Sequence, residues 1–199
     1  GVPSVDDLLW KTPLPFGLSC PVLSDDKIFL TGMENKSLLT IALDKESGKI
    51  LWKKKAPKTE IEKFHPSSSP VTPTPFVEEK RLYIYFGSYG LICYDHQGLE
   101  IWKKPLPTPR SLYGTASSPL VHENLLIQVI DDDANMPNSQ VSRSRILALD
   151  KESGEILWER FRPCRRSGWS TPTIVAHGSS RELVVLGNGS LRGYSLPDG

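Results

Sequence analysis

The chain has 199 residues with 38% hydrophobic content and a formal net charge of +1. This balance excludes the strongly basic surface that attracts nucleic acid or an anionic membrane. No apolar run is long enough to span a bilayer, so we expect neither a nucleic-acid partner nor a membrane span.

The first predicted element, within residues 1–17, is a single strand around Trp10. A unit at 18–57 follows, with four predicted strands. Cys20-Pro21 opens the first strand, where a proline without an N–H is tolerated. The second lies at 27–30, the third ends at Asp44, and the fourth carries Trp52. We expect these strands to form one antiparallel sheet.

The same order recurs in segments 70–107 and 115–163, and in 169–199 without the fourth strand. Each segment opens with Ser-Pro or Thr-Pro and continues through a short polar turn into a second apolar strand. These second strands are predicted at 81–86, 125–129 and 183–186. The single region 1–199 is therefore built from one repeated unit.

A repeated phrase joins the third strand of each unit to the fourth. Residues 42–52 and 148–158 both read Ala-Leu-Asp-Lys-Glu-Ser-Gly-x-Ile-Leu-Trp, and a shorter copy ends in Trp102. Aspartate bonds its own backbone in such a turn, and glycine supplies the positive φ. Tryptophans recur at intervals near the roughly 40–50 residues of a four-stranded propeller blade. The structural repeat residues are Trp10, Asp44, Gly48, Trp52, Asp95, Gly98, Trp102, Asp150, Gly154 and Trp158.

These residues predict an all-β chain: a β-propeller of four-stranded antiparallel blades, about four of them present. The phrase, with its upstream Ser/Thr-Pro, resembles the repeat of the PQQ-like β-propeller family. That family includes quinoprotein alcohol dehydrogenases and the propeller lipoprotein of outer-membrane protein assembly. Stretches 8–15, 85–90 and 168–172 resemble uncharacterised bacterial PQQ-like repeat proteins.

The resemblance implies a propeller of about eight blades, of which this chain would be half, and the remaining blades would then be partners. The strand at Trp10 also permits a second arrangement. It could complete the last blade and close a small four-bladed ring, which would remove the exposed sheet edges.

Strand direction assigns the loops to two faces. The turns between first and second strands and between third and fourth strands share one face, here called the far face. The second-to-third loops and the connections between blades share the other, the near face. Both long insertions, 54–69 and 131–144, fall on the near face. Long loops on a rigid scaffold commonly carry binding sites, so we expect function there.

Asp131, Asp132 and Asp133 form the most distinctive run on the near face. Their carboxylates could bind calcium or magnesium, with Asp131 and Asp133 as ligands, or they could form a solvated turn. Arg143 and Arg145 could pair with this loop. We expect Ala at Asp131 and Asp133 to change ligand or ion binding and leave the melting temperature nearly unchanged.

The connections between blades supply the other candidates, which lie just before the strands that line the central channel. Histidine, tyrosine, tryptophan and paired arginines around a funnel could bind an anionic or sugar-like ligand. The alternative is that small residues are needed where blades crowd, with tryptophan as packing. The candidates are His65, Tyr113, Arg165, Arg166 and Trp169.

No catalytic motif is present in the sequence. We therefore expect a non-enzymatic scaffold that binds a protein or saccharide partner through its loop-rich face, with no cofactor in this chain. The alternative implied by the resemblance is part of a PQQ-dependent dehydrogenase whose quinone and calcium site is completed by other blades. The resemblance also implies a periplasmic or extracellular location in a bacterium.

Overall fold

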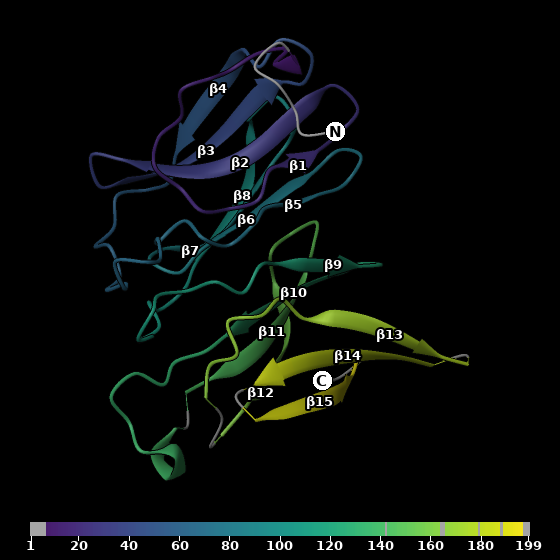
Figure 1. Cartoon of the computed structure of the whole chain (residues 1–199). Coiled ribbons are helices and arrows are strands. Elements are labelled where there is room, and N and C mark those ends of the chain that lie inside the picture. The colour runs from purple at the N-terminus through teal and green to yellow at the C-terminus, as the bar shows by residue number, and fades with distance from the viewer. Residues whose placement is uncertain (1–6, 142, 164–165, 179, 188, 197–199) are drawn as a thin grey trace.

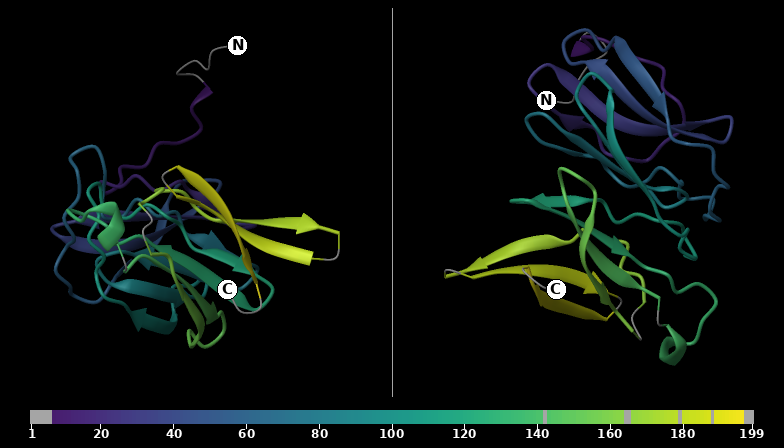
Figure 2. Two further views of the ribbon diagram at one scale, coloured as in Figure 1. Left: turned by 90° about the horizontal axis from the view of Figure 1, so that it is seen from below. Right: turned by 180° about the vertical axis from the view of Figure 1, so that it is seen from behind.

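A computed structural model describes residues 7–141, 143–163, 166–178, 180–187 and 189–196. It confirms an all-β fold of four antiparallel sheets, which follow one another in chain order from the first sheet at the top of Figure 1 to the fourth at the bottom. The view from behind in Figure 2 shows the same order. None of the described helices is long and apolar enough to cross a membrane.

Each sheet is a meander in which consecutive strands are hydrogen-bonded neighbours. The first sheet comprises β1 (Val22–Leu23), β2 (Lys27–Glu34), β3 (Ser37–Asp44) and β4 (Ile50–Lys55). The second comprises β5 (Phe76–Val77), β6 (Leu82–Phe86), β7 (Gly90–Tyr94) and β8 (Glu100–Pro105).

The third sheet comprises β9 (Leu120–His122), β10 (Leu125–Ile130), β11 (Arg145–Asp150) and β12 (Ile156–Phe161), with the short helix η2 (Asn138–Gln140) between β10 and β11. The fourth has three strands, β13 (Thr173–His177), β14 (Ser180–Gly187) and β15 (Ser190–Ser195). The predicted strand order is confirmed in all four sheets.

The hydrophobic core lies between successive sheets. One cluster joins the first and second sheets through Phe29, Ile84 and Phe86. The next two join the second to the third sheet and the third to the fourth. Every residue of β6 and β7 is buried. This explains why those strands read as continuous apolar runs, because both of their faces are covered.

The repeated phrase docks one sheet on the next. Trp102 Nε1 donates to the Lys151 carbonyl at 2.9 Å, and Trp52 Nε1 donates to the His96 carbonyl at 3.1 Å. Gly154, at φ 73°, lies against the Trp102 ring, where a Cβ would come within 2.7 Å of ring carbon. The glycine is therefore needed twice, for the turn and for the close approach of the indole.

Trp10 makes the same contact at the start of the chain. Its ring lies on the turn of the first sheet, where a Cβ on Gly48 would come within 2.1 Å of it, and Thr12 Oγ1 donates to the Gly48 carbonyl at 2.6 Å. Within the described residues, β15 is paired with β14 alone. The four-bladed ring closed by the Trp10 strand is thus not formed in this structure.

Candidate functional site

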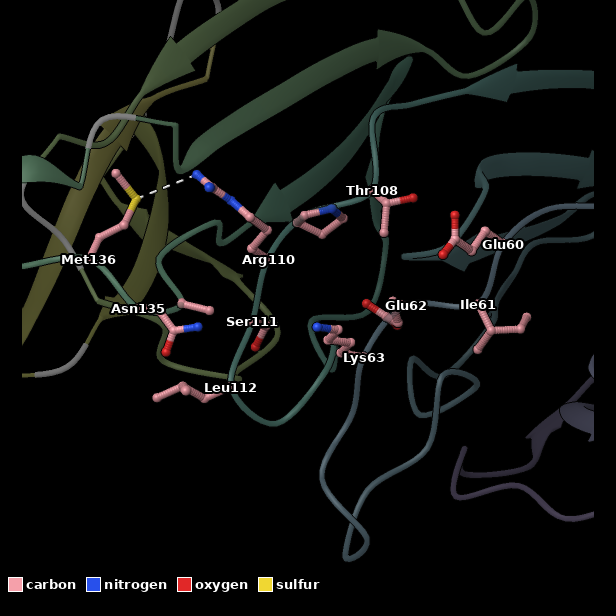
Figure 3. A pocket seen from close by; sticks show the side chains of 12 residues that line it. Glu60, Ile61, Glu62, Lys63, Thr108, Arg110, Ser111, Leu112, Asn135 and Met136 are labelled. Carbon is pink, nitrogen blue, oxygen red and sulfur yellow. Dashed lines mark hydrogen bonds between the residues drawn. The ribbon is translucent and has the colours of Figure 1, made fainter.

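The long loops gather on the near face. Residues 60–63 of the first insertion and 134–136 of the second line one cavity of about 540 Å³, together with residues 108–112 from the connection between the second and third sheets. Figure 3 shows Glu62 and Lys63 on one side of this cavity, with Asn135 and Met136 on the other. The insertions are separate in sequence and share one surface because strand direction sends both to this face.

Three exposed aromatic rings meet beside this cavity. The His65 and Tyr113 ring centroids are 5.0 Å apart, and Tyr113 meets Trp169 edge-on at 5.2 Å. Each ring comes from a different connection between sheets. Tyr113 is 45% exposed and Trp169 is 38% exposed. We call His65, Tyr113 and Trp169 the aromatic trio.

Two hydrogen bonds, one from the backbone and one between side chains, hold the trio in place. His65 N donates to the Tyr113 carbonyl at 3.4 Å, and Trp169 Nε1 donates to Ser111 Oγ at 3.3 Å. Trp169 has a φ of 47°, which is uncommon for a bulky residue and strains the backbone. The surrounding contacts thus hold a large aromatic side chain at the surface in a conformation that the chain does not favour by itself.

The aspartate run is buried and paired, so the predicted solvated turn is wrong. Asp131 accepts from Arg162 Nη1 at 2.7 Å, and the Arg162 side chain is only 1% exposed. Asp132 binds Arg143 and Arg110. Burial raises the pKa of Asp131 above its usual value, and the charge of Arg162 opposes this shift.

Asp133 is held by the segment that leads into the fourth sheet. Ser167 donates to it from both its backbone N, at 2.7 Å, and its Oγ, at 2.8 Å. Arg166 donates to the Asp133 carbonyl at 2.6 Å and also to the Met136 carbonyl. The loop therefore ties the third sheet to the fourth. From these contacts we now expect Ala at Asp131 and Asp133 to lower the melting temperature, in contrast to the expectation from the sequence.

These residues do not fit a calcium or calcium–quinone site. The three carboxylates face arginines and backbone N–H groups, which neutralise the charge that a cation would need. No group of three or more His, Cys, Asp or Glu that could hold a metal occurs in the described part of the chain.

The arginines predicted from the sequence have different positions. Arg143 pairs with Asp132 and Arg145 pairs with Glu159. Arg165 lies outside the described residues.

Sequence reasoning missed Glu62, which is 6% exposed. Its Oε1 accepts from Thr115 Oγ1 at 2.6 Å, its backbone N donates to Ser88 Oγ at 3.0 Å, and its Oε2 is buried with no partner among the described residues. Burial raises the pKa of Glu62 from 4.5 to about 7, and the Thr115 hydrogen bond opposes the shift. A single glutamate between Ile61 and Lys63 gave no signal in the sequence, because its partners Ser88 and Thr115 lie far along the chain.

A family model described as outer membrane protein assembly factor BamB matches residues 4–160 and 40–199. A search of curated proteins finds no match.

Solved propellers are similar in fold. The quinohemoprotein alcohol dehydrogenase ADHIIG of Pseudomonas putida HK5 aligns over 90% of this chain and 30% of its own, with 16% identity and a TM-score of 0.57. BamB of Moraxella catarrhalis aligns over 90% of this chain and 51% of its own, with 16% identity and a TM-score of 0.54. The quinohemoprotein alcohol dehydrogenase of Comamonas testosteroni aligns over 85% and 29%, with 16% identity and a TM-score of 0.56. The chain thus spans from under a third to about half of their lengths.

Proposed function

This chain belongs to the family of outer membrane protein assembly factor BamB, and from that membership we propose that it is a non-enzymatic propeller scaffold that binds a protein partner through its near face. The observation that carries the proposal is the aromatic trio. Tyrosine and tryptophan dominate binding energy at protein interfaces, where they act as a few central anchors. Tyr113 and Trp169 are two such rings, exposed and in edge-on contact, and His65 packs against Tyr113. An exposed aromatic group of this kind favours an interaction site.

The rigid sheets beneath the trio support the same proposal. Each ring lies on a connection between two packed sheets and is held by ring or hydrogen-bond contacts, so little side-chain freedom is lost on binding. The adjacent cavity of about 540 Å³ can accept a side chain of the partner. The family membership further favours a protein over a saccharide as partner, and we propose the bacterial periplasm as the place where they meet.

Peptide selection tests this function. A phage-displayed peptide library is selected on the purified chain, and the affinity of the selected peptides is measured by fluorescence polarisation. Tyr113→Ala and Trp169→Ala are expected to raise Kd at least about tenfold, the effect of losing an interface anchor. Leu99→Ala removes a similarly exposed apolar side chain from the far face and is expected to change nothing.

Selected peptides that bind the two near-face variants as tightly as the native chain would contradict the proposal.

The competing dehydrogenase role is tested on the same protein. Titration with PQQ and calcium would have to give a bound quinone absorbance and calcium-dependent dye reduction for that role to replace the scaffold.

A further inference from the structure

The net charge of the chain conceals a separation of charge between its two faces. The far-face turns are rich in exposed carboxylates, among them Asp25, Glu46, Glu79 and Glu155, while Asp26, Glu78 and Glu152 are paired there with Lys27, Lys151 and Arg81. The near face carries lysines and arginines at the ends of strands and in the connections. A nearly neutral protein can still steer a charged partner when its charges are segregated in this way.

Most of the near-face carboxylates are not available to these cations. Asp131, Asp132 and Asp133 are already paired with arginines or hydrogen-bonded to the chain. Glu62 is buried, and desolvation disfavours its charged form. Glu60 is an exposed carboxylate on the walls of the near-face cavities, and the exposed lysines Lys36, Lys55, Lys58 and Lys63 on the same walls outnumber it.

A lysine-lined groove crosses this face. Lys36, Lys55 and Lys58 line a cavity of about 970 Å³, which meets the 540 Å³ cavity along residues 60–62, because these residues line both. All three lysines are exposed, and within the described ranges none of their ammonium groups makes an ion pair or hydrogen bond. We call the two cavities together the near-face groove.

The 540 Å³ cavity of the groove adds apolar surface close to the aromatic trio. Ile61, Leu112 and Met136 line it, and Leu112 is the neighbour of Tyr113 in the chain. Figure 3 shows Ile61 and Leu112 at opposite ends of this cavity. The groove thus presents Lys36, Lys55 and Lys58 at one end and, at the other, apolar side chains beside the aromatic trio, with Lys63 and Arg110 also on the cavity wall.

We propose that the near-face groove binds an acidic polypeptide segment that carries an aromatic or large apolar residue. Its carboxylates meet Lys36, Lys55 and Lys58, and its apolar residue enters the cavity beside the aromatic trio. This proposal rests on the proposed function and specifies the chemistry of its partner. A polypeptide fits better than duplex nucleic acid or a lipid surface, because those polyanions need broad basic surfaces. It fits better than a single nucleic-acid strand, which needs cations along the whole groove, because the groove also carries the exposed Glu60 and its Arg110 is already paired with Asp132.

Four labelled probes test the proposal by fluorescence polarisation or co-sedimentation at low salt. They are a 12-residue Asp/Glu-rich peptide with one Phe, the same peptide with Asn/Gln for Asp/Glu, a dT12 oligonucleotide, and vesicles with phosphatidylserine. The triple variant K36Q/K55Q/K58Q removes the groove cations. The matched variant K11Q/K49Q/K80Q removes three exposed lysines elsewhere, so both variants lose the same charge.

The acidic peptide is expected to bind most tightly of the four, and the groove variant to raise its Kd roughly tenfold, the sum of three modest exposed ion pairs. The matched variant should change Kd less than about threefold, as screening predicts for distant exposed charges. Equal binding of the acidic and neutral peptides would overturn the proposal, as would preference for dT12 or vesicles, or no binding at all.

Trp169→Ala separates the two proposals. If the groove variant abolishes binding of the acidic peptide while Trp169→Ala does not, the acidic partner stands and the role of the trio fails. If the neutral peptide binds as well as the acidic one and Trp169→Ala abolishes both, the trio stands and the acidic partner is refuted.

Discussion

Glu62→Gln should change how the stability of the protein depends on pH. Glu62 accepts from Thr115 through one carboxylate oxygen, while the other oxygen is buried without a partner. Glutamine keeps the shape and the acceptor for Thr115 but cannot ionise. The comparison therefore isolates the ionisation of this one side chain.

The expected size follows from the pKa. Burial raises the pKa of Glu62 from 4.5 in the unfolded chain to about 7 in the folded one. The folded state then binds more protons than the unfolded state between these values, so stability falls as pH rises through this window. At about 1.4 kcal/mol per pKa unit, the loss is of the order of 3 kcal/mol, complete above about pH 7.5.

Urea unfolding followed by tryptophan fluorescence, at intervals from pH 4.5 to 8, measures the effect. The free energy of unfolding of Glu62→Gln minus that of the native chain should increase by about 3 kcal/mol across the window. Other titrating groups are common to both proteins and cancel. A flat difference, or one that decreases with pH, would refute the buried position of Glu62. Thr115→Val supplies a control, since it removes the donor that favours the charged form and should extend the effect to higher pH.

Two further predictions concern stability. Gly154→Ala should lose roughly 2 kcal/mol or more in urea unfolding, because a methyl group at φ 73° collides with the Trp102 ring. Gly178→Ala, at φ 59° with nothing within 4 Å, should lose only about 1 kcal/mol, and equal losses would show that the indole contact is unimportant. Asp131→Ala should lower the free energy of unfolding by about 3 kcal/mol, because it leaves the buried Arg162 charge unpaired. A loss below about 0.5 kcal/mol, which is typical of exposed positions, would show that this ion pair does not tie the sheets together.

The fold could be predicted from the sequence because its signals are local. The Asp-x-x-x-Gly turn and the following tryptophan, as in Asp150, Gly154 and Trp158, are close in sequence and recur. The order of the strands and the four-stranded antiparallel blade both follow from these recurring residues. The role of the phrase in docking one sheet on the next was not predicted, since each tryptophan contacts the turn of the following sheet.

The candidate site was predictable in position and only partly in detail. Strand direction placed His65, Tyr113 and Trp169 on one face, but their contact depends on how three connections pack. The role of Asp131 was misjudged because its partner, Arg162, is distant in sequence and carried no motif. The aspartates of residues 131–133 form buried ion pairs and hydrogen bonds because the third and fourth sheets pack around them, and this packing is not visible in the local sequence.

The central claim, that function resides in the aromatic trio, is tested most directly by fluorine NMR. The chain contains five tryptophans, which can be labelled with 5-fluorotryptophan and assigned by single Trp→Phe variants. On titration with a selected peptide, we predict that the Trp169 resonance shifts and saturates with the binding curve, while those of Trp52, Trp102 and Trp158 stay in place. A shift confined to these inter-sheet tryptophans, with Trp169 unmoved, would contradict the account.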